Sequence, residues 1–204
     1  MAGHKYAGSF RNGLFNETGT YTYADGTTYV GDFKNGFQDG QGTKTWGVNT
    51  QVSGYQYIGA FQANKQNGKG TFIYADGTKY IGSFEDDVQV GHGEKTWGSD
   101  TKFFGDKYVG AFGNNKFNGK GTYTYADEST YFGDFKDNIK TGQGTKTWPN
   151  GNQYIGAFER NKQNGIGRYT YANGDVYIGA FVDDFFHGQG TYTYADGSTY
   201  HCLL

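Results

Sequence analysis

Residues 29–46 read YVGDFKNGFQDGQGTKTW, and this stretch sets the pattern of the whole chain. It combines glycines, which loosen a backbone, with Tyr, Phe and Trp, which contribute most when they are packed. The phrase Tyr-x-Gly-x-Phe alternates with a period of two residues, which predicts a β-strand. The Thr and aromatic residues that end the stretch favour a second strand. We therefore expect a β-hairpin.

The same pattern recurs along the chain. Tyr-x-Gly-x-Phe begins 23-residue units at eight tyrosines, which are Tyr6, Tyr29, Tyr57, Tyr80, Tyr108, Tyr131, Tyr154 and Tyr177. A partial ninth unit begins at Tyr200, and two units carry five-residue inserts within 47–56 and 98–107. Each unit continues with Gly-x-Gly, except the first, where Glu17 replaces the first glycine. We predict that residues 1–204 form one repeat array.

Eight units that read Tyr-x-Gly-x-Phe and then Gly-x-Gly, with an Asp-Gly turn between them, resemble the MORN (membrane occupation and recognition nexus) repeat. The resemblance covers almost the whole chain. It implies an array of hairpins that is elongated and curved into a trough lined by the aromatic rings. It also implies scaffolding roles and self-association, often through terminal repeats.

The pattern predicts an all-β fold, a single-layer antiparallel β-meander of stacked hairpins, because no helical segment is visible to form a second layer. Asp-Gly and Asn-Gly turns at 24–27, 75–78, 172–174 and 195–198 favour tight hairpins with positive φ at both central residues. The segments after Phe, such as 34–39, are expected to be looser connections. The Asp-Gly turns have too few acidic residues for a calcium cage.

Strand parity predicts which residues share a face. Tyr29, Gly31 and Phe33 fall on one face, and so do Gly40 and Gly42 on the following strand. We expect rings from one strand to lie over bare glycine backbone in the next.

The opposite face carries Thr, Val, Ile and Ala. Branched residues favour strands in any case, which explains the composition without a partner. The alternative is a contact face for another sheet. A flat Thr surface is also typical of ice-binding proteins, but here Thr falls only on every second strand.

Three lysines interrupt the aromatic face, each two residues before a tryptophan. The candidate ligand or partner surface consists of Lys44, Trp46, Lys95, Trp97, Lys146 and Trp148. The arrangement predicts either a cation–π contact that stabilises the sheet or a row that stacks sugars or holds an acidic polymer or peptide. The two possibilities remain open at this stage.

Composition excludes several functions. The net charge of −2 has no basic patch for nucleic acid and does not support membrane binding, although the family resemblance implies it. The four histidines and the single Cys202 lack metal-ligand or nucleophile spacing, so we expect no catalysis and no cofactor. The lack of a signal peptide or an apolar 18-residue run predicts a cytoplasmic protein.

Taken together, the sequence predicts a non-catalytic scaffold that mediates protein–protein contact through an extended β surface. An uncapped sheet edge can template another chain, so we expect a homo-oligomer; the protein partner itself is not identified. The alternative is a module that binds carbohydrate or lipid headgroups in the aromatic trough.

Overall fold

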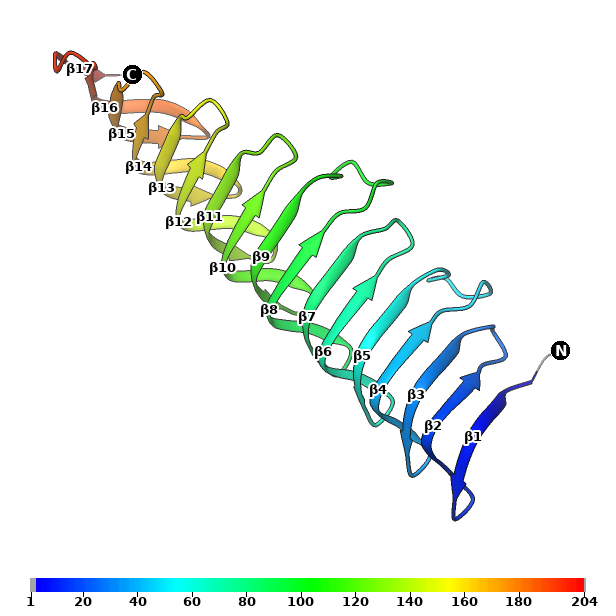
Figure 1. Ribbon diagram of the computed structural model, residues 1–204. Helices are drawn as coiled ribbons and strands as arrows, with labels where there is room; N and C mark the ends of the chain where they lie inside the picture. Colours follow the sequence, from blue (N-terminus) through cyan, green and yellow to red (C-terminus); the bar gives the residue numbers. More distant parts are fainter. Residues whose placement is uncertain (1–2, 204) are drawn as a thin grey trace. The chain divides into compact units, whose positions relative to one another are not determined.

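The computed structural model describes residues 3–203, and these form one sheet of 17 antiparallel strands without a helix (Figure 1). The predicted all-β meander is therefore confirmed. The strands are β1 (Lys5–Arg11), β2 (Leu14–Thr22), β3 (Thr28–Lys34), β4 (Phe37–Thr45), β5 (Gln56–Gln62), β6 (Lys65–Ile73), β7 (Lys79–Glu85), β8 (Val88–Thr96), β9 (Lys107–Gly113), β10 (Lys116–Thr124), β11 (Thr130–Lys136), β12 (Ile139–Thr147), β13 (Gln153–Glu159), β14 (Lys162–Thr170), β15 (Val176–Val182), β16 (Phe185–Thr193) and β17 (Thr199–Leu203).

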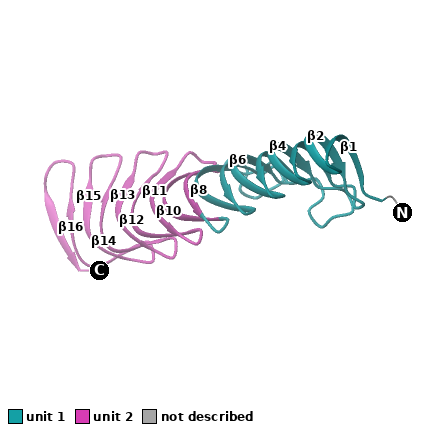
Figure 2. Cartoon of the chain, turned by 90° about the horizontal axis from the view of Figure 1, so that it is seen from below, with its two compact units in different colours: residues 1–105, 113–115 teal, residues 106–112, 116–204 magenta. Residues whose placement is uncertain are grey.

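Contacts group the chain into two compact units, shown in teal and magenta in Figure 2. Unit 1 comprises residues 1–105 and 113–115, and unit 2 comprises residues 106–112 and 116–204. In each unit, strands that follow one another in the chain pair with one another, as β3 does with β4 in unit 1 and β11 with β12 in unit 2. The two units share one pairing scheme, so each is described by the same repeated features.

The tight turn of each hairpin lies where the sequence predicted the looser connection. Asn35 and Gly36 join β3 to β4 with φ of 52° and 88°, which is the two-residue turn that the twist of a hairpin favours. At the Asp-Gly turn only Gly26 has positive φ, and the Asp25 carboxylate accepts the Thr27 N–H at 2.8 Å. That prediction was wrong because Asp25 forms a side-chain turn instead of adopting positive φ.

Gly40 lies in a β-bulge and not under a ring, in contrast to the parity expectation. The register of β3 with β4 shifts between Gly31 and Phe33, so that Asp32 alone lies opposite residues 39–41 and β4 carries two extra residues. The backbone at Gly40 has φ of 118°, and a Cβ there would point at the Asp32 side chain on the opposite face. A bulge redirects the residue it contains, which strict two-residue alternation does not anticipate.

The tyrosine that opens each unit is packed onto two glycines. A Cβ at Gly42 would lie 2.5 Å from Cε2 of Tyr29, so the ring occupies the space that any other residue would fill. The Tyr29 hydroxyl donates to the Asp32 carbonyl at 2.9 Å, and the side chain is 0% exposed. Its ring meets Phe33 and Phe61 edge to face at 5.1 and 4.9 Å. A single layer therefore buries its own aromatic core.

Residues of the tight turns link successive hairpins by hydrogen bonds. Asn64 donates its backbone N–H to the Gln38 carbonyl at 2.9 Å, and its side-chain oxygen accepts the Gln38 N–H at 2.8 Å. Asp87 bonds Gln66 in the same way. The side-chain oxygens of Asn64 and Asp87 thus satisfy backbone N–H groups of the preceding repeat.

Candidate functional site

The ring-bearing face of the sheet carries three lysine clusters, one for every two repeats. Lys44 of β4 lies opposite Tyr29 on one side and Tyr57 on the other, both of which are fully buried. Lys95 of β8 and Lys146 of β12 occupy the corresponding positions. The lysine is half-buried in each case because aromatic strands flank it.

In the first two clusters the ammonium group lies over two rings. Lys44 Nζ lies 5.8 Å from the Tyr23 ring centroid and 5.1 Å from that of Trp46. Lys95 Nζ lies 5.5 Å from the rings of both Tyr74 and Trp97. These distances are those of cation–π contacts.

The third cluster contains a second lysine. Lys146 Nζ lies 4.7 Å from the Trp148 ring and 5.9 Å from that of Tyr125. Lys140 Nζ donates to the Tyr125 hydroxyl at 2.8 Å and lies 5.4 Å from the Tyr131 ring. Two positive charges therefore share one tyrosine.

Burial alters the acid–base properties of these groups. Desolvation lowers the pKa of Lys44, Lys95 and Lys140, and it lowers the pKa of Lys146 with a further contribution from neighbouring Lys140. The carboxylates of Asp25 and Asp87 oppose this effect at Lys44. An ammonium in this environment gains more from an added anion than an exposed one does.

The residue nine positions after each unit's first tyrosine completes the site, and the sequence interpretation did not single it out. It is Gln38 or Gln89 in the first two clusters, where the amide donates to the hydroxyl of Tyr23 or Tyr74 at 2.8 and 2.9 Å. In three units it is phenylalanine, which stacks on the unit's own tyrosine, as Phe117 does on Tyr108 at 3.8 Å. Two further units have glutamine, Gln66 and Gln163, and in the third cluster the residue at this position is Lys140.

A hollow of about 350 Å³ opens beside the first cluster. Its walls are aromatic, and its polar groups include the Lys44 ammonium and the Gln38 amide. Gln38 is 2% exposed, and its Oε1 has no hydrogen-bond partner among the described residues. The lining residues are Phe15, Tyr21, Tyr23, Phe33, Gly36, Gln38, Lys44 and Asn64.

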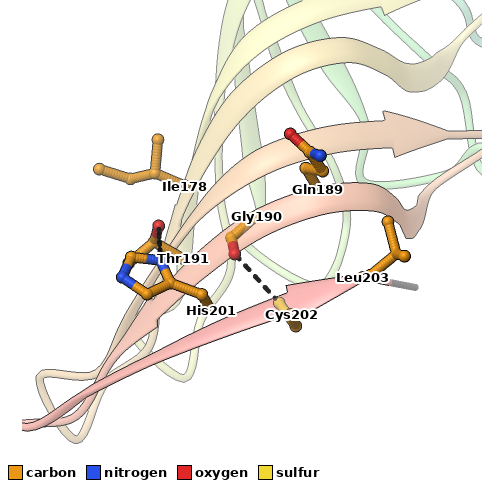
Figure 3. Close-up of a pocket in the computed structure, with 7 residues that line it drawn as sticks. All are labelled: Ile178, Gln189, Gly190, Thr191, His201, Cys202 and Leu203. Atoms are coloured by element: carbon orange, nitrogen blue, oxygen red, sulfur yellow. Dashed lines mark hydrogen bonds between the residues drawn. The ribbon is translucent and has the colours of Figure 1, made fainter.

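A second hollow, of about 490 Å³, lies against the last strands of unit 2 (Figure 3). There the Thr191 hydroxyl and His201 Nδ1 are 3.1 Å apart, and the Cys202 thiol donates to the Gly190 carbonyl at 3.4 Å.

Within residues 3–203, no group of three or more His, Cys, Asp or Glu side chains is arranged to hold a metal ion. No helix among them is long and apolar enough to cross a membrane.

The opposite face carries a row of directly paired residues, which we call the back-face row. In unit 1 it runs Thr20, Val30, Thr43, Ile58, Thr71, Ile81 and Glu94. In unit 2 it runs Thr122, Phe132, Thr145, Ile155, Arg168, Ile178 and Thr191. Its apolar members are 45–55% exposed, and no second layer covers them within the described residues.

Comparison with known structures shows a likeness of fold at low identity. The G-box domain of the microcephaly protein CPAP is 15% identical, covers 99% of both chains and gives a TM-score of 0.50. The SAS-4 TCP domain of Drosophila melanogaster, solved with a proline-rich motif of Ana2, is 17% identical with a TM-score of 0.44. It covers 67% of this chain and 73% of its own. No curated protein matches the sequence.

A sequence model of the MORN repeat matches eight segments of the chain. They are residues 6–28, 29–51, 57–79, 80–102, 108–130, 131–153, 154–176 and 177–199. Each segment begins at the tyrosine whose ring lies over paired glycines, so the matched phrase is the packing unit of the sheet. The chain therefore belongs to the MORN repeat family.

Proposed function

We propose that this protein is a non-catalytic scaffold that holds proteins, including a second copy of itself, on its extended β surface. The observation that carries the proposal is the back-face row. Each unit presents aliphatic or aromatic side chains across consecutive strands, about half exposed. In a two-layered protein such positions form the core between sheets, so a single layer leaves them available to another chain.

Residue chemistry supports a second copy as an occupant. Thr alternates with Val, Ile or Phe along most of the back-face row. The row has one charged residue in each compact unit, which is Glu94 in unit 1 and Arg168 in unit 2. Two such surfaces can pack aliphatic positions against each other with little charge to desolvate. The proposal is of a non-catalytic protein because the repeated sequence phrases contain no nucleophile motif.

Light scattering tests this proposal. The wild-type chain is expected to gain mass above one protomer between low and high micromolar concentration. Replacement of Ile58 and Ile155 by Lys puts charge into the back-face row without touching the buried rings, and should return the mass to that of a monomer. Replacement of Val48 and Phe104 by Lys, at exposed insert positions outside the strands, is the matched control. A wild-type chain that stays monomeric throughout would refute self-association.

The second candidate function is ligand binding on the ring-bearing face. The hollow beside Lys44 favours it, since aromatic walls with a few polar groups are typical of small-ligand sites. A carbohydrate or a lipid headgroup would stack on these rings. Binding of neutral oligosaccharides or of vesicles, measured by co-sedimentation for the latter, distinguishes this function from protein binding.

A further inference from the structure

The clustered lysines combine partial burial with the lack of an acidic partner, whereas several exposed lysines at the tight turns have such a partner. Exposed lysines at the tight turns pair with aspartates of the next unit, as Lys65 does with Asp86 at 3.0 Å and Lys116 with Asp137 at 3.3 Å. Among the described residues, no salt bridge involves Lys44, Lys95 or Lys146. These ammonium groups are therefore partly desolvated cations without a counter-ion.

Nearby carboxylates are already engaged elsewhere. Asp25 accepts the N–H of Thr27, and Asp87 accepts that of Gln66, each at 2.8 Å. They act on the Lys44 ammonium only through space. The ammonium thus keeps its capacity to bind an oxyanion directly.

The hollow beside Lys44 offers the remaining groups that such a ligand needs. Gln38 Oε1 is a buried acceptor without a donor. A buried polar atom of this kind costs free energy until a donor reaches it. The aromatic walls accept an apolar or planar body between the two polar ends. The hollow therefore suits an occupant with a carboxylate at one end and an N–H at the other.

We propose that the lysine clusters receive the carboxylate side chains of an extended acidic segment of a protein partner. Each clustered lysine pairs with one Glu or Asp, and at the first cluster Gln38 Oε1 accepts a backbone N–H of the same segment. This inference names the partner chemistry and rests on the proposal that the chain binds proteins. The third cluster, with Lys140 and Lys146, binds the carboxylate most tightly.

The spacing of the clusters sets the spacing of the acidic residues. Lys44 lies on β4 and Lys95 on β8, both in unit 1. Four strand steps of roughly 4.8 Å separate them by about 19 Å. An extended peptide advances about 3.3 Å per residue, so about six residues span this distance. A segment with Glu at positions i and i+6 matches the two clusters of unit 1.

Calorimetric titration of the full chain with synthetic peptides tests the proposal. One peptide carries two Glu six residues apart, the second carries them three residues apart, and the third has Gln in their place. The first peptide is expected to bind most tightly, and its binding should weaken as salt rises. Equal affinity for all three peptides, or none for any, would overturn the proposal.

Titration of lysine variants with the same peptides is the second part of the test. Lys44→Tyr with Lys95→Tyr keeps the fold, because Tyr21 and Tyr123 occupy the equivalent positions in other units. This double variant should lose roughly a hundredfold in affinity for the first peptide, about tenfold for each of the two charged contacts removed. Lys34→Tyr with Lys79→Tyr, at exposed positions, makes the same change in charge and composition and should bind as the wild type does.

Other outcomes distinguish the failure of the acidic-segment proposal from the failure of the scaffold proposal. If a uronic acid oligosaccharide binds through the same lysines and the peptides do not, the partner chemistry is wrong. If the peptides fail while light scattering still shows self-association, the scaffold proposal survives and the acidic segment does not. Equal loss of binding in the cluster and control variants would also contradict the proposal, because bulk charge would then explain it.

Discussion

At the scale of single residues, the sheet depends on a ring that lies over bare backbone. Tyr57 is 0% exposed, its hydroxyl donates to the Ala60 carbonyl at 2.9 Å, and its ring covers Gly70 of the next strand. The tyrosine thus buries apolar area and satisfies a carbonyl at the bulge in one contact. Glycine is required beneath it by lack of space, whereas glycine at the bulge is favoured by the positive φ of the backbone.

Gly42→Ala tests the contact beneath the ring. The added methyl would lie 2.5 Å from Tyr29 Cε2, so the ring must leave its position between two strands. We expect a loss of about 3 kcal/mol in the free energy of unfolding, at the upper end for an overpacked core. Urea denaturation measures the change.

The control for this variant is Gly188→Ala. Gly188 also belongs to a Gly-x-Gly phrase, but nothing lies within 4 Å of the added methyl, and φ is 60°. Only backbone strain of about 1 kcal/mol should result. Equal losses in the two variants would show that the ring contact is unimportant.

At the scale of the hairpin, the bulge decides which residues face the rings. Strand alternation predicted the faces of Tyr29, Gly31 and Phe33, because their strand is regular. It did not predict the direction of Gly40, because the bulge turns the backbone locally at this residue while Gln38 and Gly42 on either side keep their face. The identity of the tight turn was also missed, since Asn-Gly and Asp-Gly are equally good turn sequences until the side-chain bonds of Asp25 and Asn64 distinguish them.

The candidate site was predicted only in part for the same kind of reason. The lysines and tryptophans stood out because they break the repeat at a fixed interval. Gln38 and Lys140 did not, because their role depends on a hydroxyl contributed by the preceding unit, at Tyr23 and Tyr125. Such contacts join residues 15 positions apart, and only the register of the sheet brings them together.

Glu17→Gly should stabilise the first hairpin. Glu17 has φ of 61° at the position where the other seven units have glycine. Glycine removes strain of about 1–2 kcal/mol, and its own entropy costs about 0.5–1 kcal/mol, so we expect a net gain near 0.5–1 kcal/mol. Denaturation midpoints measure it. Asn16→Gly, next to it at ordinary φ, should instead destabilise, and a gain in both variants would contradict the role of strain.

At the scale of the whole molecule, the repeated tyrosines make stability sensitive to alkali. Burial raises the pKa of Tyr57, Tyr80, Tyr108 and Tyr154 to about 12, from an ordinary value of 10.0. The folded chain therefore holds these protons after the unfolded chain has released them. Their contribution to stability is complete below pH 10 and is lost as pH rises towards 12.

The clustered lysines change the stability of the fold with pH in the opposite direction to the tyrosines. Desolvation lowers their pKa from 10.5, so protonation opposes folding and stability rises as pH approaches 10.5. Since the raised tyrosines outnumber the clustered lysines, we expect the melting temperature to fall steeply above pH 10, together with the rise in tyrosinate absorbance. Ionisation of most tyrosines near pH 10 without unfolding would contradict the burial of the rings.

The central claim concerns the back-face row: it holds a second copy of the chain, while the buried rings of the other face hold the sheet together. Cysteine cross-linking between copies tests it most directly, with Cys202 first replaced by Ser. Single cysteines at Val30, Ile58, Phe132 and Ile155 should include positions that form disulfide-linked dimers rapidly at low micromolar concentration. Cysteine at exposed Val48, in an insert outside the strands, should not. If every position links at the slow rate of Val48→Cys, the back-face row is not an interface.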